Sequence, residues 1–471
     1  MITATEQLGT YLDSFTEFQK RAAGRNLPWL RQLRENAFTR FCEVGFPTTH
    51  DEDWRFTNVS AIARTPFELP AESGVSAREL EDLYLSSAAC QLVFVNGRLI
   101  RELSRWGELP EQVTVNGLAQ EIESKSVILE SHLGRYLNIQ RDAFSALNTA
   151  FAEDGAYVYV PKGAVLNAPI YLLWVSTPSP KPSMTNPRNL VIVEHEAQAT
   201  IVEDYVSIGE SPAFSNAATE LVVGENAVVS HYMIEREHHQ AFNVSTLRIQ
   251  QERSAIVSSH SVLLGGGLVR NNVHPVLAGE GGECLINGLF IGSRRQHLDN
   301  YMLVEHASPH CGSRQFYNGI LDDHAHGVFH GRIVVHKEAQ KTDAKQTNRN
   351  LLLSDDAQID TKPQLEIYAD DVKCTHGATI GQIEENALFY LRSRGIDEVS
   401  AKKLLLLAFA GECLDRMKPS PAREHVQRLI HEHLLQLAIS RNRGDQEAPK
   451  GVSAPQSSSP ADPSRNWEEV G

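Results

Sequence analysis

Two side chains that commonly bind iron stand two positions apart near the end of a strand-rich region. They are Cys374 and His376, in the segment Tyr368–Gly381. Alternate side chains of an extended strand point to the same side, so these two would share a face, with Cα atoms about 6.5–7 Å apart. A thiolate and an imidazole at that spacing suit a cluster or metal held between two chains. Spacing alone also fits a simpler interpretation, a buried cysteine beside a hydrogen-bonded histidine.

A second group of candidate ligands lies upstream, in the histidine-rich stretch His306–His336. His324 and His326 would share a face if both lay on one strand, as in the HxH metal element of cupins, and His330 stands near the place of the acidic cupin ligand. His324, His326 and His330 are therefore weaker metal candidates. Solvated or hydrogen-bonded strand histidines are the simpler interpretation, because an imidazole needs no metal to be satisfied.

The sequence offers no loop for nucleotide phosphates. The pattern GxxxxGK[ST] does not occur, and no glycine is followed directly by lysine. The glycine runs 265–267 and 281–282 open no helix and are interpreted as turns. We therefore expect that this chain binds no nucleotide and is not itself an ATPase.

The composition excludes several classes of protein. The 471 residues are 41% hydrophobic and 22% charged, as in a soluble globular protein, and the longest apolar runs fall far short of the roughly 20 residues that cross a bilayer. The net charge of −15 repels nucleic-acid phosphates. Scattered cysteines without a CxxC spacing indicate reduced thiols, and the acidic, polar start predicts no secretory signal. We expect a cytoplasmic protein without membrane or nucleic-acid partners.

The central part of the chain, from about Tyr157 to about Gly381, consists of short runs rich in Val, Ile, Leu, Thr and Tyr separated by turn residues. Several turns place an alanine between an acidic turn and the next strand, as at Ala197, Ala227 and Ala357. Such degenerate repetition favours a parallel β-helix whose coils share an apolar interior. Because the spacing of the repeat is not constant, a jelly-roll sandwich fits the repeats equally well.

The flanking residues have a different periodicity. Near the N-terminus the pattern predicts a helix that begins at Pro28 and ends at Gly45, and a hairpin that turns at Asn96-Gly97. After Gly381 the pattern predicts short amphipathic helices. The expected parts are a mixed domain over 1–150, a β-helix core over 151–383, a helical domain over 384–441 and a disordered tail over 442–471.

The segment that contains Cys374 and His376 strongly resembles the SufD family. Members of that family run from the same Cys-x-His-Gly-Ala-Thr sequence into Phe-Tyr-Leu-x-Ser-Arg-Gly, which stands here at 389–395. The element Pro47–Thr57 is similar to that family's Pro-x-x-x-x-Glu-x-Trp-x-Phe/Tyr-Thr element, and the resemblance extends to about Arg441. The related SufB proteins usually have Glu-His-Glu-Ala in this place, which favours SufD over a SufB-type paralogue.

The resemblance implies a mostly β fold, in which a right-handed parallel β-helix core lies between an N-terminal mixed α/β domain and a C-terminal helical domain. It implies that an edge of the β-helix pairs with SufB, that the C-terminal helices dock on the SufC ATPase, and that the chain is a scaffold rather than an enzyme. By position, His376 corresponds to the histidine at which a transient iron–sulfur cluster forms against SufB, with Cys374 as its helper. A homodimer through the same edge is compatible with the family, and the presence of flavin on the complex stays open.

One alternative belongs to a different class of protein. A cupin-like or β-helix metalloenzyme could act on a sugar or small acid with the histidines of His306–His336. Stoichiometric metal in the lone chain would favour that alternative over a scaffold.

Overall fold

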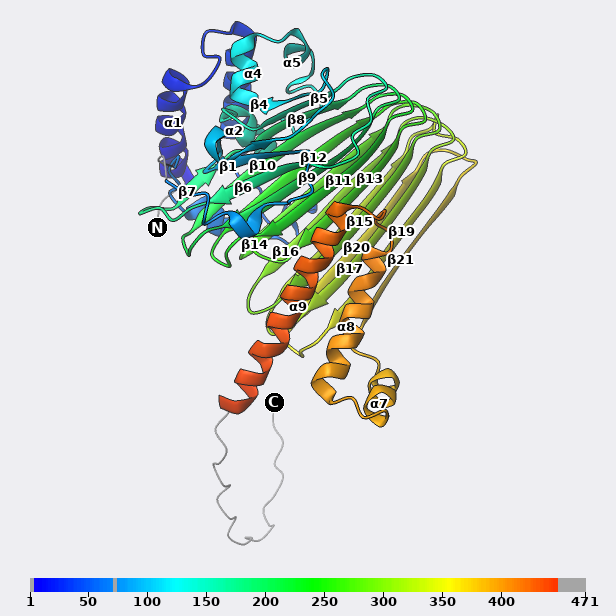
Figure 1. The fold of residues 1–471 in the computed structure, drawn as a ribbon. Helices are drawn as coiled ribbons and strands as arrows, with labels where there is room; N and C mark the ends of the chain where they lie inside the picture. The colour runs from blue at the N-terminus through cyan, green and yellow to red at the C-terminus, as the bar shows by residue number, and fades with distance from the viewer. Residues whose placement is uncertain (1–3, 71–73, 448–471) are drawn as a thin grey trace, which may run out of the picture.

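The computed structural model describes residues 4–70 and 74–447. Its centre is a parallel β-solenoid of about eight turns, in which two long sheets enclose a shared core (Figure 1). Most strands pair in parallel with the strand two elements further along the chain. The jelly-roll alternative is therefore wrong, because the strands of a jelly roll pair antiparallel.

The solenoid has two sheets, called A and B, and the strands of each are given in their spatial order. Sheet A contains β20 (Gln358–Ile367), β18 (His326–Val335), β16 (His297–His306), β14 (Leu268–Leu277), β12 (Phe242–Gln251), β10 (Ala213–Val223), β8 (Arg188–Val193), β5 (Ala156–Val160) and β4 (Thr114–Gly117), with β7 (Ser183–Thr185) beside β10. Sheet B contains β2 (Arg98–Leu99), β1 (Cys90–Val95), β6 (Ile170–Ser176), β9 (Gln198–Ser207), β11 (Val228–Arg236), β13 (Ile256–Leu263), β15 (Glu283–Gly292), β17 (Gly312–Leu321), β19 (Asp343–Leu352) and β21 (Lys373–Gly381), with β3 (Arg105–Trp106) beside β1.

The coils repeat irregularly because their turns differ in length. The strands of sheet B from β9 onward begin at residues 198, 228, 256, 283, 312, 343 and 373, which gives a period of 27 to 31 residues. At each corner that leads from sheet A into sheet B, one residue has a positive φ. The backbone N–H of this residue donates to a carbonyl oxygen at the same corner of the next coil. The residues are Glu196, Asn226, Ser254, Gly281, His310 and Lys341. The turns therefore stack on one another even though the period varies.

Small residues at the corners let the turns close over the apolar interior. Ala197, Ala227 and Ala357 are all buried there, as the sequence pattern predicts. Inside, alternate side chains of both sheets meet in one hydrophobic core that runs along the solenoid.

The N-terminal residues form helices and a hairpin that cover the first coils. The helices are α1 (Ala4–Arg21), α2 (Pro28–Val44), α3 (Ser60–Arg64), α4 (Leu118–Ser124), α5 (Val127–His132), α6 (Ala143–Ala150) and the 3-10 turns η1 (Glu52–Trp54), η2 (Glu81–Leu83) and η3 (Arg101–Leu103). Pro28 opens α2 and Gly45 ends it, as predicted. The predicted hairpin turn at Asn96-Gly97 is also present, and β1 pairs in parallel with β6, so this hairpin is the first rung of sheet B.

Three C-terminal helices follow the last coil: α7 (Glu385–Ser393), α8 (Glu398–Leu414) and α9 (Pro421–Glu447). Helices α8 and α9 lie along the outer face of sheet B and bury a second hydrophobic cluster against it (Figure 1). Helix α9 continues to Glu447 and so includes residues 442–447, which the sequence pattern assigned to the tail. The rest of that tail, 448–471, lies outside the described residues.

A buried charged cluster fixes α9 to sheet B. Asp204 of β9 is fully buried, where it accepts hydrogen bonds from Arg236 Nε at 2.9 Å and from the Tyr171 hydroxyl at 2.5 Å. Nε2 of His425 on α9 lies 3.4 Å from the same carboxylate. Burial by itself raises the pKa of Asp204, but Arg236 and His425 outweigh burial and hold the pKa well below its usual range. The cluster therefore has a permanent negative charge at its centre.

The outer face of sheet A has a more exposed cluster around Glu305. The Glu305 carboxylate accepts a hydrogen bond from His274 Nε2 at 2.5 Å and lies 3.5 Å from Arg248. The hydrogen bond from His274 lowers the pKa of Glu305 to about 2, against the opposing effect of burial. Ionised Glu305 thus links three consecutive strands, β12, β14 and β16.

We expect Glu305→Gln to lower the free energy of unfolding by about 1–3 kcal/mol near neutral pH. The folded pKa of Glu305 lies below the ordinary glutamate value of 4.5, so its contribution is fully present above about pH 4.5 and is lost as the pH falls toward about 2. Urea unfolding of the wild type and the variant should give a constant difference near neutral pH that narrows in acid. A difference that does not change with pH would contradict this role.

Candidate functional site

The last coil of the solenoid has open edges. β21 ends sheet B and β20 ends sheet A, and among the described residues each pairs with a single neighbour, β19 and β18 respectively. An edge strand presents backbone N–H and C=O groups that can pair with a strand of another chain. This end of the solenoid is therefore suited to adding strands.

Cys374 and His376 both lie on β21, as predicted, and on its inward side. In the register of sheet B, Cys374 follows Ala344 and His376 follows Gln346, and both of these β19 residues are buried in the interior. Side chains in register on parallel strands point the same way. Because no coil stacks on β21 within the described residues, Cys374 is half-buried against the core and His376 is exposed.

The two side chains differ in how easily they could bind metal. Burial raises the pKa of the Cys374 thiol, so the thiol is protonated near neutral pH and must lose its proton to become a ligand. His376 is exposed to solvent at the open end. The arrangement offers one accessible imidazole and one thiol that requires activation.

Apolar side chains surround the open end. Ile367 is the last residue of β20 in sheet A, and Tyr368 follows it. These two residues are 40% and 63% exposed, and Ile380 of β21 is 51% exposed. Sequence reasoning did not identify this apolar rim. Its only signal in the sequence was that apolar residues occupy strand positions within the last coil. Exposed apolar side chains beside an open sheet edge indicate an interaction surface.

The element Pro47–Thr57 packs across the outer face of sheet A near this end. The Thr57 hydroxyl donates to Asp299 at 2.5 Å, and the Arg270 guanidinium lies 3.8 Å from the ring centre of Trp54. Its Glu52 forms an ion pair at 3.0 Å with Lys362 of the edge strand β20. The N-terminal part of the chain therefore supports the last coil directly.

The weaker metal candidates lie apart. His326 and His330 point outward from β18, where they hydrogen-bond Asp360 at 2.7 Å and Gln364 at 2.8 Å. His306, at the start of the histidine-rich stretch, is buried and hydrogen-bonds Ser313. No group of three or more His, Cys, Asp or Glu side chains within residues 4–70 and 74–447 could hold a metal ion.

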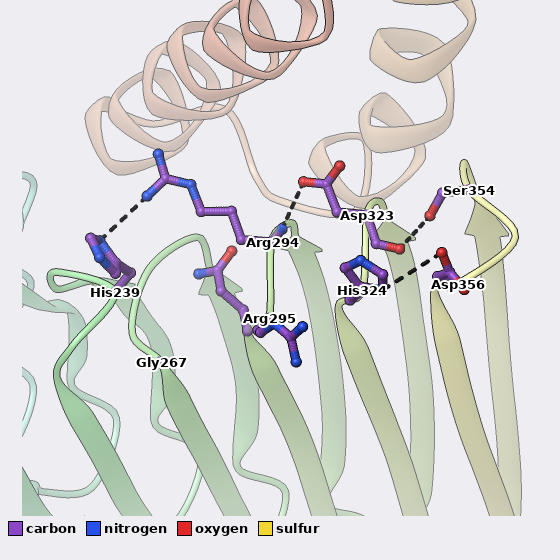
Figure 2. A pocket seen from close by; sticks show the side chains of 9 residues that line it. His239, Gly267, Arg294, Arg295, Asp323, His324, Ser354 and Asp356 are labelled. Atoms are coloured by element: carbon purple, nitrogen blue, oxygen red, sulfur yellow. Dashed lines mark hydrogen bonds and ion pairs between the residues drawn. The ribbon is translucent and has the colours of Figure 1, made fainter. Parts of the chain in front are cut away.

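The prediction that His324 and His326 share a strand face is wrong. Figure 2 shows His324 in the turn before β18, where Asp323 has a positive φ and the strand begins only at His326. His324 borders a surface cavity of about 600 Å³ and lies 3.6 Å from Asp356. Arg294 lies across this cavity, 3.5 Å from the His239 ring. Cations and carboxylates are mixed along the cavity, so it has no single electrostatic preference.

Comparison with known protein families gives two adjoining matches. Residues 5–172 match the SufBD protein N-terminal region, and residues 175–409 match the SufBD core domain of SUF system FeS cluster assembly. The chain is 36% identical to an iron–sulfur cluster assembly SufBD family protein of Synechocystis, over 85% of this chain and 90% of that protein. It is 32% identical to the iron–sulfur cluster assembly protein SufD of Escherichia coli, over 83% and 90%. It is 25% identical to SufD of Bacillus subtilis, over 86% and 93%.

A β-solenoid with an open last coil, together with these matches, defines a scaffold-type component of iron–sulfur cluster assembly, and the chain belongs to the SufBD family. Within that family it is a SufD-like subunit of the SUF system. None of the helices described in the structure is long and apolar enough to span a membrane.

Proposed function

We propose that this chain pairs through its open last coil with a SufB-type partner and that an iron–sulfur cluster is assembled between the two. The observation that carries the proposal is the position of Cys374 and His376 beside an apolar rim, on a strand whose outer edge pairs with no other strand among the described residues. Strand addition at such an edge supplies backbone hydrogen bonds, and the rim supplies apolar area to bury. The cluster is the cargo of this scaffold and leaves it for a recipient protein.

His376 is the ligand that this chain contributes, and Cys374 assists it. The exposed imidazole can reach a cluster on the facing partner without displacing any part of the core. The Cys374 thiol lies on the same face and can bind only after it loses its proton to a base or to the metal itself. This chain supplies one ligand and the partner supplies the others. The cluster is therefore held only while the two proteins are paired, as assembly and release require.

A second surface suits the SufC ATPase. α7 extends beyond the solenoid (Figure 1). Phe389 and Tyr390 on α7 are 73% and 57% exposed, and Leu404 of the neighbouring α8 is 47% exposed. Aromatic side chains in an exposed apolar group are typical of the energetic centre of a protein interface. The chain itself acts as a cytoplasmic scaffold that binds no nucleotide and makes or breaks no covalent bond of a substrate.

We expect the double variant Phe389→Ala, Tyr390→Ala to weaken binding of the SufC-type ATPase at least about tenfold, because it removes two exposed aromatic anchors. Isothermal titration of the ATPase into the full chain measures the effect. Val127→Ala on α5 is the matched control, since Val127 is 81% exposed but belongs to the N-terminal part. Equal loss in both variants, or loss in neither, would contradict docking at α7 and α8.

Co-expression with the SufB-type and SufC-type proteins of the same cell tests the scaffold role. We expect a stable three-component complex, and we expect the SufB-type protein to displace any homodimer that the lone chain forms through the same edge. A charged residue at the rim, Ile380→Asp, should prevent pairing with the SufB-type protein and leave ATPase binding intact. Failure to form any complex would contradict the proposed function.

A further inference from the structure

Gln346 lies one coil behind His376 on the inward face of sheet B. The register pairs Gln346 of β19 directly with His376 of β21. Gln346 is only 1% exposed, so solvent does not reach its carboxamide. It is the polar side chain next to the proposed ligand along the axis of the solenoid.

The carboxamide of Gln346 has one satisfied end and one unsatisfied end. Its Nε2 donates to Oε1 of Gln315 on β17 at 2.7 Å, one coil further from the open end. Its Oε1 is buried and has no hydrogen-bond partner among the described residues. Oε1 and Nε2 leave the same carbon in different directions, so the bond of Nε2 to β17 leaves Oε1 available to another donor. A buried acceptor without a donor costs about 1–3 kcal/mol, so this oxygen favours a donor nearby.

Gly331 on the opposite sheet leaves the room for this arrangement. A Cβ atom at position 331 would lie 2.0 Å from Nε2 of Gln346 and 3.1 Å from Oε1 of Gln315. The two carboxamides therefore occupy the space that a side chain on β18 would fill. The interior of the solenoid therefore restricts where the carboxamide of Gln346 can lie.

We propose that Gln346 is the positioning residue for His376: no hydrogen bond joins the two side chains in the structure, and a rotation of the exposed imidazole lets one of its N–H groups donate to Oε1. The bond decides which ring nitrogen has the proton. The other nitrogen, with its free lone pair, then faces out of the open coil toward the partner. Such outer hydrogen bonds fix the tautomer and the orientation of histidine ligands. This inference rests on the proposed role of His376 as a cluster ligand.

The hydrogen bond can be tested on the full chain without partner or metal. Long-range ¹⁵N–¹H spectra of the ¹⁵N-histidine-labelled chain, recorded where imidazole is neutral, report the tautomer, and the signal of His376 is the one lost in His376→Gln. We expect one dominant tautomer in the wild type and in Gln346→Glu, which keeps an acceptor, and a mixture in Gln346→Leu. Lys345→Met, an exposed neighbour on the same strand, should leave the tautomer unchanged. The same tautomer population in Gln346→Leu as in the wild type would overturn the hydrogen bond.

A second variant tests the same hydrogen bond even if Gln346→Leu does not fold. Gly331→Ala keeps Gln346 but places a methyl group where its Nε2 lies, and the flexible carboxamide must move. We expect the same shift from one tautomer to a mixture. An unchanged tautomer in a folded Gly331→Ala chain would also count against the proposal.

The effect on the cluster is measured separately in the reconstituted complex. The affinity of the complex for iron is measured by competition with a chelator. We expect this affinity to be about 10–100-fold weaker in Gln346→Leu than in the wild type, and to be retained in Gln346→Glu. Equal retention in Gln346→Leu would overturn the positioning role. If instead His376→Ala keeps its full cluster, the proposed ligand is wrong, and the tautomer spectra still decide whether Gln346 binds His376.

Discussion

His376→Ala is expected to lower the yield of iron–sulfur cluster on the reconstituted complex at least about tenfold, because it removes the accessible ligand that this chain offers at the open coil. Iron and acid-labile sulfide are assayed after anaerobic reconstitution. The complex itself should form as well as in the wild type, since strand pairing uses backbone groups and the apolar rim. A loss of cluster without a loss of complex separates the ligand from the scaffold.

Two further variants make this prediction specific. His324→Ala removes an exposed histidine that lies in a turn of the preceding coil and should leave the yield unchanged. Cys374→Ser should cause a smaller loss than His376→Ala, because the thiol is half-buried and protonated. If the yield falls in His324→Ala and survives in His376→Ala, the cluster forms elsewhere on the chain.

Asp204→Asn is expected to lower the free energy of unfolding by about 3–5 kcal/mol, because it leaves Arg236 beside a neutral amide in a buried site. The same change removes the charge that holds His425 of α9. Hydrogen exchange should therefore rise first along α9 and on the outer face of sheet B that it covers. Urea unfolding and hydrogen exchange measure the two effects on the full chain.

A surface ion pair between α8 and sheet B provides the control. Glu412 of α8 pairs with Arg349 of β19, and both side chains are more than a third exposed. Glu412→Gln should change the free energy of unfolding by less than about 1 kcal/mol. Similar losses in Asp204→Asn and Glu412→Gln would show that burial of the Asp204 cluster does not anchor α9.

The sequence by itself determined the features that depend on neighbouring residues. Pro28 and Gly45 bound a helix, Asn96-Gly97 forms a two-residue hairpin turn, and the two-residue spacing of Cys374 and His376 places them on one face of a strand. Each follows from local geometry: the fixed φ of proline, the freedom of glycine at positive φ, and the period of two along a strand. The turn alanines indicated a repeat, but they left a β-helix and a jelly-roll sandwich equally open, because a local repeat does not show how the strands pair.

Only the tertiary structure decided which distant residues meet. His324 has the same two-residue spacing from His326, yet His324 lies in the turn before β18 and His326 is the first residue of the strand, because the start of β18 is set by how its coil stacks on its neighbours. Gln346 stands next to His376 across a period that varies from coil to coil. The register between coils depends on the length of every turn and on the packing of the shared core, and no local pattern contains that information. Contacts such as that of Asp204 with His425 follow from this register and from the docking of α9.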